Sequence, residues 1–343
     1  MQAICELPES TLRTTYRVAG QSIVVETHDS WAARVIEELF AGWYLTADTA
    51  GVKATKADTA VPDIVISSSV SPLQIPTDWH QFEVAGGGQC HTDGTQSYID
   101  IEGSTVAIGT TLATVAVWTN GPLEIQSPVV TRLVTYALAA ALRRRRLFEL
   151  HSGAVIHPES GQGVLIIGPS GSGKSTLTVQ LASAGWSFLT DDVLLLGDEG
   201  GQVKTWPLRR CFAVTSETFA TSSFLQARTN LDYMKAQRDD KKQFFPHGVF
   251  VSEFKESCIP RTLFFSELAD HSRSQVLRLS PGETMTRLIR MSPWSCYDRA
   301  TAADHMAALS SLVKQSVGYS LLAGKDLLDP EISARLIAAQ MRD

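Results

Sequence analysis

The most informative stretch of this sequence is Gly168-Pro169-Ser170-Gly171-Ser172-Gly173-Lys174-Ser175-Thr176. It satisfies the pattern Gly-x-x-x-x-Gly-Lys-Ser/Thr, in which glycines let successive backbone N–H groups point at phosphate oxygens. An apolar run over residues 164–167 leads into the stretch, and an apolar-periodic segment follows it with Leu177, Val179, Leu181 and Ala182. A strand, a glycine-rich loop and a helix in this order are typical of a phosphate-binding loop. The sequence therefore predicts that residues 168–176 bind the phosphates of a nucleotide.

The residues of this loop differ in their expected tasks. Lys174 can reach the β- and γ-phosphates, and the hydroxyl of Ser175 can ligate Mg²⁺. The N-terminus of the following helix adds positive potential at the same place. We therefore expect ATP and Mg²⁺ to bind here, and the loop pattern leaves GTP open as the nucleotide.

A pair of carboxylates, Asp191-Asp192, follows the predicted strand Trp186–Leu189. A strand next to the one that enters a phosphate loop ends close to the γ-phosphate. One acid there can hold Mg²⁺, for which we select Asp191, and the other can accept a proton from an attacking hydroxyl. The alternative is an ordinary charged turn between two strands. His151 lies in a predicted strand upstream of the loop and has, considered alone, no assigned role.

Together these elements resemble the catalytic domain of the HPr kinase/phosphorylase family. The resemblance is carried by Leu150-His151-Ser152-Gly153, by the glycine-rich loop, by Gly185-Trp186 and by Thr190-Asp191-Asp192. Members of this family are bacterial serine kinases whose fold is akin to ATP-dependent phosphoenolpyruvate carboxykinase. The resemblance implies that Asp192 is the base that deprotonates an acceptor serine, that His151 is an active-site partner near the phosphates, and that Lys174 takes part in catalysis. It also implies a homo-oligomer.

The chain departs from the family pattern downstream of Leu196. It has no counterpart of the family's Ile-Arg-Gly-Leu-Gly-type segment. Its layout is more similar to divergent HPr-kinase-related proteins found beside peptide-modification genes, including lasso-peptide kinases. That similarity implies a peptide or protein acceptor, such as a ribosomally made peptide precursor. Phosphoryl transfer also needs cations at the γ-phosphate, for which the candidates are Arg209, Lys241 and Lys242.

The rest of the chain predicts a second domain before the catalytic one. Short alternating runs separated by glycine or polar clusters indicate strands at 15–18, 22–27, 63–67, 97–102, 105–108 and 114–118, with helices over 30–45 and 127–147. We therefore divide the chain into a β-rich domain, 1–148, for substrate docking or assembly, and an α/β domain, 149–343, with an HPr-kinase-like fold. The latter is expected to hold a hairpin of strands 150–156 and 163–167, strands at 193–196, 262–265 and 275–279, a helix after the capping box Ser280–Glu283, and helices over 302–317 and 330–341. Residues 209–250 show no clear period.

Composition excludes several classes of protein. The 343 residues contain 30 Lys and Arg against 36 Asp and Glu, whereas proteins devoted to nucleic acids usually carry a basic excess. The longest apolar stretch, Val129–Leu142, is interrupted by Arg132 and falls short of the ~20 residues of a membrane span. The 5 cysteines form no Cys-x-x-Cys pair, and the N-terminus has no secretory pattern. We expect a cytoplasmic protein that binds neither nucleic acid nor membranes.

Three functions remain open at this stage. The first is an ATP-dependent kinase acting on a serine of a peptide or protein. The second is a small-molecule kinase with the same site. The third is a nucleotide-dependent switch or ATPase without kinase activity, which the adjacent acids Asp191 and Asp192 disfavour.

Overall fold

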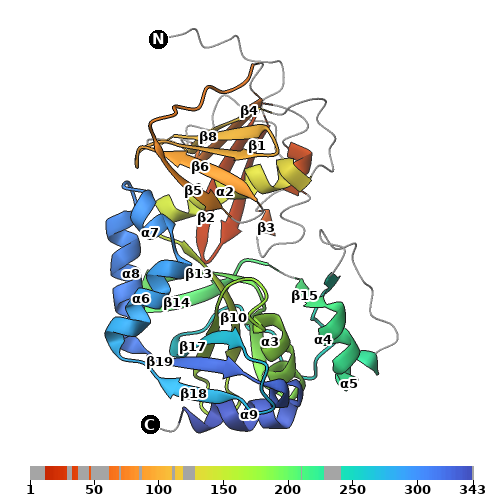
Figure 1. Ribbon diagram of the computed structural model, residues 1–343. Helices are drawn as coiled ribbons and strands as arrows, with labels where there is room; N and C mark the ends of the chain where they lie inside the picture. The colour runs from red at the N-terminus through yellow and green to blue at the C-terminus, as the bar shows by residue number, and fades with distance from the viewer. Residues whose placement is uncertain are drawn as a thin grey trace. The chain divides into compact units, whose positions relative to one another are not determined.

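A computed structural model of the chain describes residues 12–28, 33–37, 46–47, 62–68, 71–84, 87–109, 113–118, 128–209, 211–227 and 241–341 (Figure 1). The chain folds into two compact units, one made of Met1–Arg145 and Tyr297–Ala302, the other of Arg146–Cys296 and Ala303–Asp343. The second unit thus begins close to the predicted start at Glu149. The return of residues 297–302 to the first unit was not predicted.

The first unit is built on a nine-stranded sheet with the strand order β3-β1-β2-β4-β9-β8-β7-β6-β5. The neighbours β2, β4 and β9 run parallel, and β9, β8, β7, β6 and β5 form an antiparallel meander. All six strands expected in this region are present, but β3, β5 and β6 were missed, because each is short and contains at most two apolar side chains. The strands are β1 (Leu12–Val18), β2 (Gln21–Thr27), β3 (Thr46–Ala47), β4 (Ile64–Ser68), β5 (His80–Val84), β6 (Gly88–Thr92), β7 (Ser97–Ile101), β8 (Ser104–Ile108) and β9 (Ala113–Trp118).

One long helix, α2 (Pro128–Arg144), packs against β4, β7, β8 and β9 of this sheet. Its apolar side chains, such as Leu133 and Val134, are fully buried. The predicted helix over 30–45 is seen as helix at residues 33–37, and its other residues lie outside the described part of the chain. The short segment 297–302 completes the unit: the ring of Tyr297 stacks on Phe82, with 4.1 Å between centroids.

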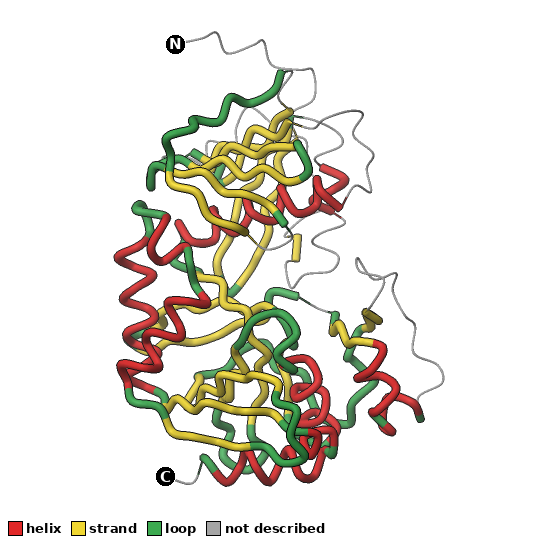
Figure 2. The backbone as a smooth tube through the Cα atoms, in the orientation of Figure 1, coloured by secondary structure: helices red, strands yellow, loops and turns green. Residues whose placement is uncertain are grey.

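The second unit contains an eight-stranded mixed sheet (Figure 2). Its main order is β14-β13-β10-β11-β17-β19-β18, and β12 also pairs with β10. The predicted hairpin is confirmed as β10 and β11, while β11, β17 and β19 run parallel. The strands are β10 (Phe148–Ile156), β11 (Gly163–Ile167), β12 (Ser187–Thr190), β13 (Val193–Glu199), β14 (Gln202–Pro207), β17 (Pro260–Leu268), β18 (Gln275–Arg278) and β19 (Val317–Ala323).

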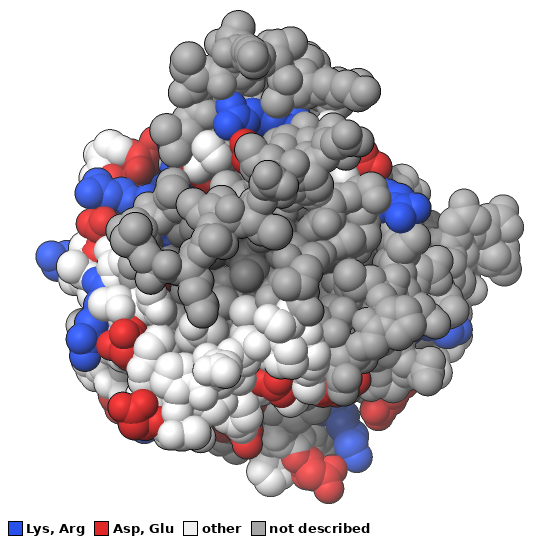
Figure 3. Space-filling model, turned by 90° about the horizontal axis from the view of Figure 1, so that it is seen from above, with Lys and Arg blue, Asp and Glu red and all other residues white. Residues whose placement is uncertain are grey.

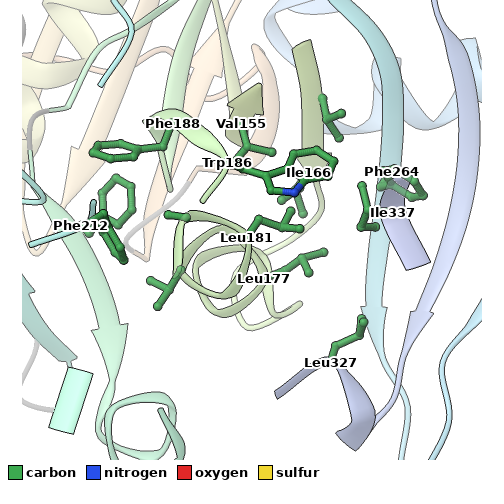
Figure 4. Close-up of a cluster of buried hydrophobic side chains, with 14 of the residues drawn as sticks. Val155, Ile166, Leu177, Leu181, Trp186, Phe188, Phe212, Phe264, Leu327 and Ile337 are labelled. Atoms are coloured by element: carbon green, nitrogen blue, oxygen red, sulfur yellow. The ribbon is translucent and has the colours of Figure 1, made fainter. Parts of the chain in front are cut away.

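Helices cover both faces of this sheet. Successive side chains of β11 point to opposite faces, so that Ile166 joins one buried cluster and Ile167 the other. Ile166 packs with Leu181 of α3 (Lys174–Ser183) and Ile337 of α9 (Pro330–Ala339), as Figure 4 shows. The opposite cluster includes side chains of α6 (Pro281–Met291) and α8 (Ala302–Gln315). The second unit is therefore a mixed α/β structure with its core on two faces of one sheet.

The C-terminal part follows the prediction with one correction. The capping box is confirmed, because Ser280 Oγ accepts the N–H of Glu283 while the Glu283 carboxylate accepts the N–H of Ser280. The expected helix over 302–317 is too long, since α8 ends at Gln315 and β19 begins at Val317. Val317 and Tyr319 favour a strand, and β19 lies between β17 and β18. The short elements here are α7 (Trp294–Tyr297) and the 3₁₀ helix η1 (Lys325–Leu328).

The segment without clear period, 209–250, forms a small substructure of the second unit. It contains β15 (Phe212–Thr215), α4 (Ser216–Thr221), α5 (Ser223–Gln226) and β16 (Lys241–Phe244), and β15 and β16 pair antiparallel. Phenylalanine rings hold it together, with Phe250 stacked on Phe224 at 5.3 Å between centroids. These contacts join residues far apart in sequence, which local periodicity does not reveal.

Charged side chains of both signs are mixed on the face of the molecule that Figure 3 shows, with Lys and Arg beside Asp and Glu along its edge. Within the arginine run at the end of α2, Arg143 is buried rather than on the surface, and its Nε lies 3.1 Å from Asp298 Oδ2. In the described part of the chain, no helix is both long and apolar enough to span a membrane.

Candidate functional site

The glycine-rich loop lies between a fully buried strand and a helix. All residues of β11 are buried, and the chain leaves the strand at Gly168 to enter α3 at Lys174. Gly171 and Gly173 have φ angles of 84° and 86°, in the left-handed region that favours glycine. The two glycines therefore set the path of the loop around the N-terminus of α3.

A close approach explains the first glycine. A Cβ atom on Gly168 would lie 2.6 Å from the carbonyl oxygen of Ser266 in β17 and 2.5 Å from Ser172 Oγ. The hydroxyl of Ser172 is buried without a hydrogen-bond partner among the described residues. The loop is thus folded tightly against β17, and one of its own polar groups is left unsatisfied.

The side chain of Lys174 turns back onto the loop. Its Nζ donates hydrogen bonds of 2.8 Å to the carbonyl oxygens of Gly168 and Pro169. Burial lowers the pKa of Lys174, the nearby charge of Lys241 lowers it further, and the charge of Asp192 opposes both effects. An ammonium group has three N–H donors, so two of them orient the side chain and the third remains for a ligand.

Asp191 is completely buried next to the start of α3. Its Oδ2 accepts the N–H of Ala213 at 3.0 Å, while Oδ1 has no hydrogen-bond partner within the described ranges. Burial, with a smaller contribution from the charge of Asp192, raises the pKa of Asp191 to about 7. The hydroxyl of Ser175 lies 3.5 Å from the main-chain oxygen of Asp191. A buried carboxylate with an unsatisfied oxygen beside a hydroxyl is suited to a cation.

Asp192 lies in a different environment from its neighbour. Its side chain is 28% exposed, Oδ2 accepts a 2.8 Å hydrogen bond from Arg209, and Oδ1 lies 3.7 Å from Nδ1 of His151. Burial alone would raise the pKa of Asp192. The interactions with His151 and the positive charges of Arg209 and Lys174 outweigh it and hold the pKa of Asp192 well below its usual range. Asp192 is therefore an ionised carboxylate that solvent can reach.

The route by which the acidic pair reaches the loop differs from the expected one. We predicted that its strand would lie next to the loop strand, which is wrong: β12 pairs with β10, and the neighbours of β11 are β10 and β17. The hairpin of β10 and β11 occupies that side. Gly153 of β10 allows the acidic turn to lie close to α3 all the same. A Cβ at this position would lie 2.2 Å from Thr178 Oγ1 and 3.7 Å from the main-chain oxygen of Asp191. The missing side chain lets α3 and the acidic turn approach β10 together.

The three candidate cations separate in space. Arg209 pairs with Asp192, and the charge of Lys241 acts on both Lys174 and Asp191. The ammonium of Lys242 instead lies 4.0 Å from the centroid of the Phe219 ring, and neighbouring side chains of a strand point to opposite faces. Arg209 thus contacts Asp192, Lys241 acts electrostatically on Lys174 and Asp191, and Lys242 contacts Phe219 of α4.

Sequence reasoning missed two hydroxyl contacts of the loop. Ser266 Oγ donates to the carbonyl oxygen of Ser172 at 2.8 Å, and Thr176 Oγ1 lies 2.8 Å from Oγ1 of Thr218 in α4. Both partners come from distant segments. The sequence carried no signal for either contact, because a single Ser or Thr in a strand or short helix is unremarkable.

The residues present fit a magnesium–nucleotide complex. No group of three or more His, Cys, Asp or Glu that could hold a metal occurs within the described residues, so the protein alone offers no complete cage. The unsatisfied Oδ1 of Asp191 and the Ser175 hydroxyl are oxygen ligands of the kind Mg²⁺ prefers, and phosphate oxygens would supply others. The donor set therefore suits a metal that arrives with its nucleotide.

Comparison with known proteins adds little to this geometry. No protein-family model matches the sequence, and neither does any curated protein. One similar solved structure is the HPr(Ser) kinase/phosphatase from Coxiella burnetii, which has 12% sequence identity and a TM-score of 0.29. The match covers 57% of this chain and 97% of that one. A likeness at this level does not assign a function, so the function has to be inferred from the site itself.

Proposed function

We propose that this chain is an ATP-dependent kinase of the HPr-kinase-like type that transfers the γ-phosphate of Mg·ATP to a serine hydroxyl of a peptide or protein. The observation that carries the proposal is the meeting of three groups at the N-terminus of α3: the ammonium of Lys174, the buried carboxylate of Asp191 and the partly exposed carboxylate of Asp192. A charged turn without function would not require a fully buried acid with an unsatisfied oxygen.

In this proposal the loop binds the phosphates. The N–H groups at the start of α3 and the remaining N–H donor of Lys174 would donate hydrogen bonds to phosphate oxygens. The positive potential at the helix N-terminus favours the negative charge of these oxygens. Asp191 and Ser175 would hold Mg²⁺, which when bound neutralises charge on the phosphate oxygens. Lys241 supplies further positive potential, since its charge acts on Asp191 and Lys174.

Asp192 accepts the proton of the attacking hydroxyl. Oδ2 is engaged by Arg209, so Oδ1 is the atom left to receive the proton. A carboxylate with a lowered pKa is a weak base, but phosphoryl transfer needs little help from a base until the new bond is well advanced. Arg209 and His151 orient the carboxylate, and both carry donors that suit phosphate oxygens.

The test is transfer of label from γ-labelled ATP in the presence of Mg²⁺. The acceptors are peptides encoded beside the gene, with small hydroxyl compounds as a second set. The unsubstituted chain should label a peptide, and Asp192→Asn should lose most of the transfer. Asp198→Asn, which changes an exposed carboxylate near the end of β13 in the same unit, should not.

The outcomes separate the remaining functions. Label on a small compound and on no peptide would identify a small-molecule kinase. Release of labelled phosphate with no acceptor labelled would identify an ATPase or switch. Equal transfer by Asp192→Asn and the unsubstituted chain would rule out the role given to Asp192.

A further inference from the structure

The strand β17 extends beyond the end of β11 and runs along the glycine-rich loop. The last pair between the two strands joins Ile167 to Phe265, after which β11 ends and β17 continues to Leu268. The extension is held on its other side by β19, with Ser266 opposite Leu321. The extension is therefore a firmly paired piece of strand that faces the loop with one edge.

Three contacts join this extension to the loop. Ser266 Oγ donates a 2.8 Å hydrogen bond to the carbonyl oxygen of Ser172, and the two residues are 1% and 5% exposed. The main-chain oxygen of Ser266 lies so close to Gly168 that a Cβ atom, if this residue had one, would be only 2.6 Å from it. A methyl carbon of Leu268 lies 3.0 Å from the place of a Cβ on Gly173. The only side-chain hydrogen bond among these three contacts is that of Ser266.

The bond of Ser266 fixes the orientation of one peptide group. In a planar trans peptide, the C=O and the N–H point in opposite directions. Because the Ser172 carbonyl is held toward β17, the N–H of Gly173, which belongs to the same peptide, points away from β17. Gly173 immediately precedes α3, so its N–H is among the donors that a helix N-terminus offers to an anion.

We propose that Ser266 is a positioning residue for nucleotide binding, holding the Ser172–Gly173 peptide so that the Gly173 N–H faces a phosphate of a nucleoside di- or triphosphate. Ser266 does not touch the phosphate but acts through the peptide it anchors. The proposal rests on the nucleotide binding proposed above and adds to it a residue outside the loop. Without this hydrogen bond, the Ser172–Gly173 peptide is free to rotate. Its carbonyl oxygen would then face the phosphate, and the two negatively polarised groups would repel each other.

The test compares two deletions of the same kind of hydrogen bond. Ser266→Ala removes the bond to the Ser172 oxygen, and Ser333→Ala removes a buried 2.9 Å bond from Ser333 Oγ to the Leu327 oxygen in the same unit. Calorimetry with MgADP gives the Kd, and urea unfolding without nucleotide gives the stability. Both variants should lose stability, but only Ser266→Ala should bind MgADP roughly tenfold more weakly, a factor equal to about 1.4 kcal/mol.

A third variant keeps the test decisive. Ser266→Cys keeps the unbranched shape of the side chain and a weak donor, so its Kd should lie between those of the unsubstituted chain and Ser266→Ala. If Ser266→Ala does not fold, the Kd of Ser266→Cys decides. An unchanged Kd in the Ser266 variants would overturn this inference alone. Failure of the unsubstituted chain to bind MgADP would overturn the proposed function, and the inference with it.

Discussion

Replacement of Asp191 by Asn should stabilise the protein at neutral and alkaline pH. The substitution preserves the shape of the side chain and an oxygen to accept the N–H of Ala213, but it removes a charge that is completely buried. The pKa of Asp191 rises from 3.8 to about 7, and a tenfold change in proton affinity corresponds to about 1.4 kcal/mol. The charge therefore costs on the order of 4 kcal/mol above pH 7.

The sign of the pH dependence follows from proton binding. Between pH 4 and pH 7 the folded state holds a proton on Asp191 that the unfolded state has released, so the contribution of Asp191 to stability falls as the pH rises through this window. The advantage of Asp191→Asn should thus be largest at pH 8 and smaller by about 2 kcal/mol at pH 5.5.

The measurement is urea unfolding, followed by circular dichroism, of both proteins at pH 5.5 and pH 8 without metal or nucleotide. Asp198→Asn, a change at an exposed carboxylate, should alter the free energy of unfolding little at either pH. The reasoning is refuted if Asp191→Asn is no more stable than the unsubstituted chain at pH 8, or if its advantage is the same at both pH values. A gain in stability at the expense of magnesium–nucleotide binding would indicate that the buried charge is retained for its ligand.

Three further substitutions test other parts of the second unit. Gly153→Ala places a Cβ 2.2 Å from Thr178 Oγ1 and should lower the free energy of unfolding by about 1–3 kcal/mol, part of which the double variant Gly153→Ala/Thr178→Ala should recover in the same urea experiment. Arg209→Ala removes the bond that orients Asp192 and should reduce label transfer at least tenfold, whereas Lys242→Ala should reduce it much less; equal losses would mean that the two cations are wrongly distinguished. Ser280→Ala removes the capping box of α6 and should cost about 1 kcal/mol in urea unfolding, with no change in label transfer.

The sequence was most informative where a local pattern determines the structure. The strand and helix on either side of the glycine-rich loop, the hairpin before it and the capping box at Ser280 each depend on a few neighbouring residues, and all form as expected. The strand β19 was missed because α8 ends at Gln315 and only Ser316 separates it from Val317, where β19 begins. The boundary between α8 and β19 contains no capping signal that would have marked the end of the helix.

The candidate site was predictable in its members but not in its arrangement. Both carboxylates, His151 and Arg209 were selected from the sequence, and they lie within one cluster. Their separate environments were not predictable, because the burial of Asp191 depends on β15 and the exposure of Asp192 on its turn. The strand order around β11 and the contact of Ser266 are likewise set by pairing between distant segments, which a single sequence does not encode locally.

Calorimetric titration with Mg·ATP tests most directly whether residues 168–176 form a phosphate-binding loop. The unsubstituted chain should bind one ATP per chain, and Lys174→Ala should weaken binding by at least tenfold, because Lys174 supplies the only ammonium bonded to this loop in the described part of the chain. Lys314→Ala, which removes an exposed lysine at the end of α8, should leave the Kd unchanged. Absence of binding by the unsubstituted chain, or equal affinity of Lys174→Ala, would contradict the account.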